Sequence, residues 1–113
     1  MFRRDTMEQL PVMNLEELKQ KIKNGKYILF FSATWCPDCT FIKPAMPEIV
    51  KDFPNYKFIA VDRDDNLDLA KEMNIFGIPS FVAFDNGVET GRLVNKDRKT
   101  KAQVEDFIKS LPQ

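Results

Sequence analysis

One short segment, Tyr27 to Phe31, constrains the fold of this chain most strongly. All five of its residues are apolar, and a continuous apolar run of this length is typical of a strand that is buried on both faces. A sheet that contains such a strand needs a covering layer on each side. The run therefore predicts an α/β fold, with helices on both faces of a central sheet.

Helical and strand patterns alternate along the rest of the chain. Leu15, Leu18 and Ile22 follow Asn14 at helical spacing, and Glu17 stands where a capping box needs it. In chain order, the other predicted elements are a helix over 37–53, a strand over 56–61, a helix capped by Asp64 or Asp65, strands over 81–84 and 88–94, and a helix over 100–111.

The two strands near the end of the chain flank Asn86-Gly87, which is a strong hairpin signal because both residues tolerate positive φ. The predicted order is strand, helix, strand, helix, strand, helix, hairpin and helix. Strand–helix alternation implies parallel pairing, and the hairpin adds antiparallel strands. The chain should therefore form a mixed sheet.

The chain of 113 residues is long enough for one domain. We expect residues 1–8 to be a flexible N-terminal segment and residues 9–113 to form the domain. A secretory signal needs an apolar core of about 7–15 residues, and none follows the two arginines of the first ten residues. The run over 27–31 is too short to cross a bilayer, so a cytoplasmic protein without membrane association is expected.

Composition excludes several classes of function. The 17 Lys and Arg residues balance 17 Asp and Glu residues, so there is no basic field to attract nucleic acid. The absence of His rules out Ser-His and Cys-His pairs and imidazole metal ligands. Two Cys residues do not complete a tetrahedral zinc site alone. Thiol and carboxylate chemistry remain.

Both cysteines lie in one segment, directly after the buried strand and at a predicted helix start. Cys36 and Cys39 are three residues apart, with Pro37 at the first helical position. Residues at this spacing share a helix face, with Cβ atoms about 5–6 Å apart, and small adjustments bring them into disulfide range. The pair is therefore suited to cycle between dithiol and disulfide.

The two thiols should differ in reactivity. Free N–H groups and the helix dipole favour a thiolate at Cys36, which is the predicted nucleophile. Cys39 should be more buried, with a higher pKa, and should resolve the mixed disulfide. Inert core thiols, or half of a metal site shared between chains, are the alternatives. The sequence of strand, Trp35, cysteine pair and helix favours redox chemistry over both.

With these residues in place, the chain resembles the thioredoxin family from about residue 9 to 111. The resemblance implies a thioredoxin fold, with a central mixed five-stranded sheet flanked by four helices, and a cis peptide bond between Ile78 and Pro79. The motifs that carry it are Trp35-Cys36-x-x-Cys39, Pro44, Gly77-Ile78-Pro79 and Asn86-Gly87.

The resemblance also implies how substrate is bound. The backbone at Ile78, between Gly77 and Pro79, would pair with an extended substrate segment, which is a short form of strand addition. Trp35 would belong to the apolar rim that receives that segment, although ordinary packing at a strand end is also consistent with its position.

The activity implied is that of a monomeric thiol–disulfide oxidoreductase that reduces protein disulfides. Electrons would come from a thioredoxin-reductase-like flavoprotein, and no bound cofactor or metal is needed. Three alternatives stay open. The Cys36-Pro37 pair suggests a glutaredoxin-like, glutathione-linked activity, the groove at Ile78 and Pro79 could serve a binding module without turnover, and the two thiolates could deliver a metal.

The chain departs from the family pattern in its predicted core. Thioredoxins carry a buried Asp six residues before the nucleophilic Cys and a buried Lys on the next strand, and this chain has Phe30 and Phe58 at those positions. The replacement of both charged residues together is physically reasonable, because removal of only one of them would leave the other as an unpaired buried charge. Without that Asp, deprotonation of Cys39 must use water, Asp38 or a substrate group.

The spacer between the cysteines departs as well. Thioredoxins usually have Gly-Pro, whereas this chain has Pro37-Asp38, as in a thioredoxin-related group with Cys-Pro-Asp-Cys. Besides favouring the helix start, Asp38 should oppose a thiolate at Cys36 and so tune its reactivity. Asp38→Asn is predicted to shift thiolate formation to lower pH.

A third departure lies just past the last predicted strand. The Gly that thioredoxins usually have there corresponds to Asn95 in this chain, and Asn tolerates left-handed geometry better than most residues.

Two prolines fall inside the helix predicted over 37–53. Pro44 removes one hydrogen bond and is expected to kink the helix. Pro47 follows three residues later and leaves the continuity of the helix open.

Overall fold

The structure of the protein is a computed structural model that describes residues 7–112. Its centre is a five-stranded sheet in the order β1-β3-β2-β4-β5, with β1, β3 and β2 parallel and β4 and β5 antiparallel. The predicted mixed sheet is confirmed, and the apolar run over 27–31 lies in its central strand. The strands are β1 Glu8–Gln9, β2 Lys26–Ser32, β3 Lys57–Asp62, β4 Ser80–Asp85 and β5 Val88–Leu93.

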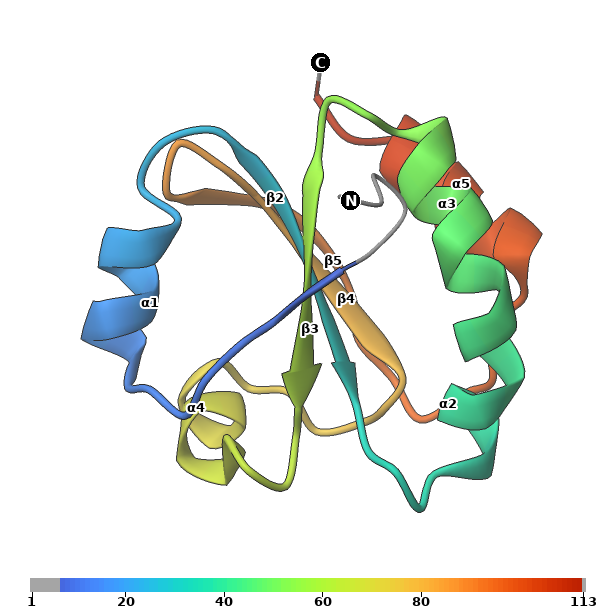
Figure 1. Cartoon of the computed structure of the whole chain (residues 1–113), viewed down its shortest axis with the longest axis horizontal. Helices are drawn as coiled ribbons and strands as arrows, with labels where there is room; N and C mark the ends of the chain where they lie inside the picture. The colour runs from blue at the N-terminus through green and yellow to red at the C-terminus, as the bar shows by residue number, and fades with distance from the viewer. Residues whose placement is uncertain (1–6, 113) are drawn as a thin grey trace, which may run out of the picture.

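Helices cover both faces of the sheet, as a strand buried on both sides requires. Figure 1 shows α1 and α4 on one side and α2, α3 and α5 on the other. The helices are α1 Leu15–Lys21, α2 Pro37–Ile42, α3 Met46–Asp52, α4 Leu67–Glu72 and α5 Lys101–Lys109, and a 3₁₀ turn, η1 Lys43–Ala45, joins α2 to α3. With α2, η1 and α3 counted as one broken helix, the four predicted helices are present. No described helix is long and apolar enough to cross a membrane.

The helix predicted over 37–53 is not continuous. Pro44 has no N–H to donate, and the chain forms the 3₁₀ turn η1 around it. Pro47 lies in the first turn of α3, where its missing N–H has no intrahelical partner to lose. The two prolines thus divide the segment into two short helices, and α2 is left as a separate unit that begins at the cysteines.

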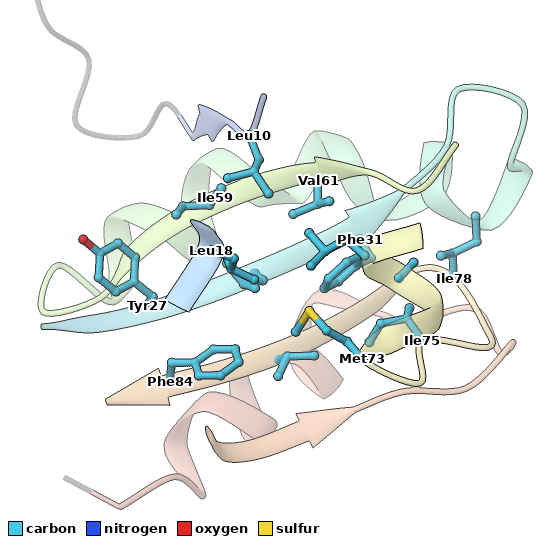
Figure 2. Close-up of a cluster of buried hydrophobic side chains, with 14 of the residues drawn as sticks. Leu10, Leu18, Tyr27, Phe31, Ile59, Val61, Met73, Ile75, Ile78 and Phe84 are labelled. Atoms are coloured by element: carbon cyan, nitrogen blue, oxygen red, sulfur yellow. The ribbon is translucent and has the colours of Figure 1, made fainter. Parts of the chain in front are cut away.

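The apolar residues of β2 alternate between two buried clusters, one on each face of the sheet. Leu29 and Phe31 lie in a cluster that contains both cysteines. Figure 2 shows Phe31 and Val61 of the sheet and Leu18 of α1 among the members of this cluster. Residues of the other face, among them Phe30, pack with α3 and α5.

Two local predictions are confirmed at the ends of elements. Asn14 and Glu17 form a capping box at the start of α1. At the hairpin, Asn86 and Gly87 have φ of 50° and 83°. These conformations form the tight turn that joins β4 to β5, and the pairing of the two strands shifts register between Ala83 and Phe84.

The cap predicted for α4 is wrong. The helix is preceded by Asn66 instead of Asp64 or Asp65. The carboxylate of Asp62 accepts the N–H groups of Asp64 and Asp65 at 2.8 and 3.2 Å. That turn delays the helix start, and it leaves Asn66 Oδ1 to accept the N–H of Met13 at 3.0 Å.

The chain joins the sheet slightly earlier than expected. Glu8, placed in the flexible segment by sequence, pairs with Ile59 in β1. Met7 packs against a buried cluster. The rest of the predicted flexible segment, residues 1–6, lies outside the described residues.

Candidate active site

The two cysteines stand at the start of α2, where β2 and its following loop deliver them. Cys36 is the N-cap residue, Pro37 is in the first turn, and Cys39 is one turn further on. The sulfur of Cys36 accepts the backbone N–H of Cys39 at 3.1 Å. Both cysteines are free thiols in this structure. The sulfur of Cys36 therefore occupies the position in which a capping oxygen stabilises a helix start.

Burial separates the two thiols as predicted. Cys39 is fully buried, and Cys36 keeps 5% of its surface exposed. Burial raises the pKa of the Cys39 thiol from 9.0 to about 12, and its side-chain hydrogen bond with Cys36 acts in the same direction. Cys39 is thus held as a protonated thiol at neutral pH, while Cys36 is the cysteine of the pair that keeps some exposed surface.

Trp35 lies beside the cysteines with 60% of its surface exposed. Its Nε1 donates to the carboxylate of Asp64 at 2.6 Å, and the guanidinium of Arg63 lies 5.4 Å from its ring centroid. The ring is therefore exposed and also fixed in orientation. Sequence reasoning assigned Asp64 to a helix cap and did not foresee this contact, because it joins two loops that are 29 residues apart.

The turn of Gly77, Ile78 and Pro79 lies against the same cluster as the cysteines. The peptide bond between Ile78 and Pro79 is cis, as the resemblance implied. Ile78 is buried in the cluster that contains Cys36 and Cys39. The structure thus brings this turn and the cysteine pair together from positions about 40 residues apart.

Gly77 is required by a close approach between two backbone segments. A Cβ atom at Gly77 would lie 2.4 Å from the carbonyl carbon of Asn95 and 2.5 Å from its oxygen. No side chain fits there. The hydroxyl of Ser80 donates to the carbonyl of Gly77 at 2.5 Å and fixes the turn further.

Asp38, between the cysteines, is paired with a residue that sequence analysis did not single out. Arg98 Nε donates to Asp38 Oδ1 at 2.9 Å. The guanidinium of Arg98 also lies 4.4 Å from the ring centroid of Phe41. Charge alone could not have revealed this partner, because Arg98 is 60 residues away in the sequence and is one of many cations.

The core positions that depart from the family pattern are well packed. Phe30 is stacked on Phe81, with ring centroids 5.0 Å apart and an angle of 15° between the rings. Phe58 lies in the same buried cluster. Phe30 also lines a pocket of about 500 Å³, together with Ser32 and Lys43. Aromatic rings therefore occupy the positions of the charged pair.

Among the described residues, no group of three or more His, Cys, Asp or Glu side chains is placed to hold a metal ion.

Comparison with known proteins decides the family. The family model described as Thioredoxin matches residues 9–110. The chain belongs to the thioredoxin family. It is 33% identical over 82 residues to mitochondrial thioredoxin-3 of Saccharomyces cerevisiae, a match that covers 72% of this chain and 65% of the yeast protein. It is 41% identical over 85 residues to a thioredoxin H-type of Fagopyrum esculentum, covering 74% of this chain and 73% of that relative.

Solved structures confirm the thioredoxin fold. Oxidised mitochondrial thioredoxin 3 from Saccharomyces cerevisiae superposes with a TM-score of 0.79 at 29% identity, covering 97% of this chain and all of that one. Thioredoxin from Schistosoma mansoni gives a TM-score of 0.77 at 32% identity, covering 96% and 97%. The family and the Cys36–Cys39 pair support thiol–disulfide oxidoreductase activity, and the glutaredoxin-like and binding-module alternatives are not favoured.

Proposed function

We propose that this thioredoxin-family protein reduces disulfides in protein substrates, with Cys36 as the attacking thiol and Cys39 as the resolving thiol. The observation that supports these roles is the placement of the sulfurs. Cys36 caps the start of α2 and accepts the N–H of Cys39, and the thiol of Cys39 is fully buried. A hydrogen-bond donor aimed at a sulfur stabilises its thiolate, which is the attacking species.

In the first step, the Cys36 thiolate attacks one sulfur of the substrate disulfide. A bond forms between Cys36 and that sulfur, the substrate S–S bond breaks, and the other substrate sulfur leaves as a thiolate. We assign the Cys39 proton to this leaving thiolate, because Asp38 is held by Arg98. A base is needed at this point, since burial keeps the pKa of Cys39 near 12.

In the second step, the deprotonated Cys39 attacks the sulfur of Cys36. The Cys36–Cys39 disulfide forms, and the second substrate sulfur leaves as a thiolate that takes a proton from water. The substrate gains two electrons, and the cysteine pair loses two. The three-residue spacing on one helix lets the disulfide close with small movements.

Substrate would bind over the surface formed by Trp35 and the Gly77-Ile78-Pro79 turn. The exposed indole provides an apolar contact, and the backbone at Ile78 would pair with an extended segment of the substrate. Trp35 directly precedes Cys36 in the chain, and Ile78 belongs to the same buried cluster as Cys36, the thiol that must reach the disulfide. Pro37 and Asp38, in the first turn of α2 between the cysteines, would tune the reactivity of the pair.

A thioredoxin-reductase-like flavoprotein is the proposed electron donor, and the proposed location is the cytoplasm. The protein would act as a monomer, without a bound cofactor. The relative in yeast is named as mitochondrial, so fractionation of cells that produce the tagged protein is the test of location. Recovery in a mitochondrial fraction would replace the cytoplasmic proposal.

Reduction of insulin disulfides tests the activity. Dithiothreitol supplies electrons in one series, and NADPH with a thioredoxin reductase supplies them in the other, with Cys36→Ser and Cys39→Ser as controls. We expect wild-type turnover in both series and no turnover with Cys36→Ser. Turnover with dithiothreitol alone would point to another donor, and no turnover in either series would contradict the proposed activity.

A further inference from the structure

The loop over 94–100, between β5 and α5, contacts two parts of the active site: the spacer between the cysteines and the Gly77-Ile78-Pro79 turn. Arg98 in this loop reaches Asp38 between the cysteines. The backbone of Asn95 lies so close to Gly77 that a Cβ atom on Gly77 would be 2.4 Å from the carbonyl carbon of Asn95. A segment with these two contacts is placed to act on the cysteine pair.

A lysine is buried in this loop. Lys99 is only 3% exposed, and its Nζ donates to the carbonyl and side-chain oxygens of Asn95 at 3.0 and 2.7 Å and to the carbonyl of Asp97 at 2.6 Å. All three ammonium protons thus have acceptors, and all three acceptors are neutral. The position of Lys99 is fixed, and its charge is not cancelled by the groups that hold it.

Asn95 makes this arrangement possible. Its side chain accepts from Lys99 and from the backbone N–H of Asp97 at 2.9 Å. The Gly that is usual in the family at this position would offer neither bond. The departure at Asn95, which the sequence alone left without a role, therefore accompanies a buried cation.

Lys99 directly follows Arg98, whose guanidinium binds Asp38, so its buried charge lies in the part of the loop that reaches the active site. Burial lowers the pKa of Lys99, and negative charge on Asp97, on Asp38 and on an ionised Cys36 acts in the opposite direction. Attraction of this kind is mutual, so a positive Lys99 also favours the negative form of the thiols.

Arg98 acts on the same site through Asp38. It is held on two sides, by the Asp38 carboxylate and by the ring of Phe41. An aspartate next to Cys36 opposes its thiolate, and a guanidinium 2.9 Å away offsets that charge. Residue Phe41, itself 48% exposed, gives Arg98 a surface on which to stack.

We propose that Arg98 and Lys99 are positioning residues for the cysteine pair, and that together they supply the positive charge that offsets Asp38 and favours the Cys36 thiolate. The inference rests on the proposed function for its purpose. It assigns an electrostatic role to this loop in a chain that has Phe30 and Phe58 at the positions of the family's buried charged pair. The charged groups that surround the pair are Asp38, Lys43, Arg63, Asp64, Asp97, Arg98 and Lys99.

The test is the pH dependence of iodoacetamide alkylation at Cys36, located by mass spectrometry in the reduced protein. Arg98→Gln and Lys99→Met are each expected to raise the midpoint by about 0.3–0.7 pH unit. The control is Arg92→Gln, which removes the same charge from an ion pair with Glu89 on β5, and it should leave the midpoint unchanged. A midpoint that matches the control would overturn the role of the residue concerned.

A double-mutant comparison separates charge from structure. If Arg98 acts through Asp38, Arg98→Gln should shift the alkylation midpoint less than half as far in an Asp38→Asn protein as in the wild type. An undiminished effect would overturn that route. Lys99→Arg keeps the charge and should retain the wild-type midpoint, and loss of that midpoint in a folded protein would contradict a role for charge. If circular dichroism shows that Lys99→Met does not fold, the midpoints of the Arg98 variants decide whether the loop supports the Cys36 thiolate.

Alkylation needs no protein substrate, so this experiment is independent of the insulin assay. A wild type that fails to reduce insulin contradicts the proposed function. A wild type that reduces insulin, with midpoints unaffected by both substitutions, contradicts only the role of the loop.

Discussion

The backbone N–H of Cys39 donates to the sulfur of Cys36 over 3.1 Å, while the thiol of Cys39 itself is fully buried. One residue therefore supplies both a donor to the attacking sulfur and the sulfur that completes the reaction. The arrangement follows from the position of Cys36 as the N-cap of α2, where backbone N–H groups have no partner inside the helix.

The two thiols should be modified in a fixed order. In the reduced protein at neutral pH, iodoacetamide is expected to alkylate Cys36 at least tenfold faster than Cys39, since the pKa of Cys39 is raised to about 12 and thiolate is the reacting form. Peptide mapping after short exposures measures the order. Equal labelling of both residues in the folded protein would contradict the assigned roles.

The raised pKa of Cys39 also predicts a pH-dependent stability of the reduced protein. The folded state holds this proton more tightly than the unfolded state, so stability is lost as pH rises from 9.0 towards 12. Urea unfolding should show a loss of about 1 kcal/mol by pH 10. Cys39→Ser, which has no thiol at this position, serves as the control and should lose less.

Packing around Phe30 predicts a large effect on stability. Phe30 is 1% exposed and stacked on Phe81, so Phe30→Ala should lower the free energy of unfolding by about 3–5 kcal/mol. Val88→Ala, at a site that is 66% exposed, should change it by no more than about 0.5 kcal/mol. Urea unfolding of both variants measures the difference. A cost below about 1 kcal/mol for Phe30→Ala would show that the cluster repacks without it.

Most of the fold could be predicted because it depends on local patterns. The apolar run over 27–31 identified the central strand, Asn14 and Glu17 marked a helix start, and Asn86-Gly87 marked the hairpin. The break at η1 could not be predicted, because a proline within a helical pattern is consistent with a kink or a break. Packing decides between them.

The site was predictable only in part. Cys36 and Cys39 are neighbours in sequence, so their relationship could be read directly. The contacts of Trp35 with Asp64 and of Asp38 with Arg98 span 29 and 60 residues. In a chain with 17 cations and 17 anions, composition offers too many possible partners, and only the folded arrangement selects one.

The contact between Gly77 and Asn95 predicts that Gly77→Ala will harm activity. The new Cβ would lie 2.4 Å from a backbone carbon, so the turn at Ile78 must move or the loop at Asn95 must. We expect a loss of about 1–3 kcal/mol in stability and a lower rate of insulin reduction.

Gly91→Ala is the matched control for this clash. The Cβ at Gly91 would lie 2.6 Å from Leu111 Cδ2, but that atom is the end of a side chain and can rotate away. Its effect on activity should be small. Equal rates for the two variants would show that the turn need not stay in place for catalysis.

The bond between Trp35 and Asp64 can be tested through fluorescence, because Trp35 is the single tryptophan of the chain. Asp64→Ala removes the acceptor of Nε1 and also the carboxylate that holds Arg63. The indole should then move more freely, and the steady-state anisotropy of its emission should fall. Asp65→Ala, in which a neighbouring carboxylate is removed while the bond to Trp35 is kept, is the control. If the exposed ring positions substrate, Asp64→Ala should raise the KM for insulin more than it lowers kcat. An unchanged KM together with a lower anisotropy would show that the orientation of Trp35 does not matter for substrate binding.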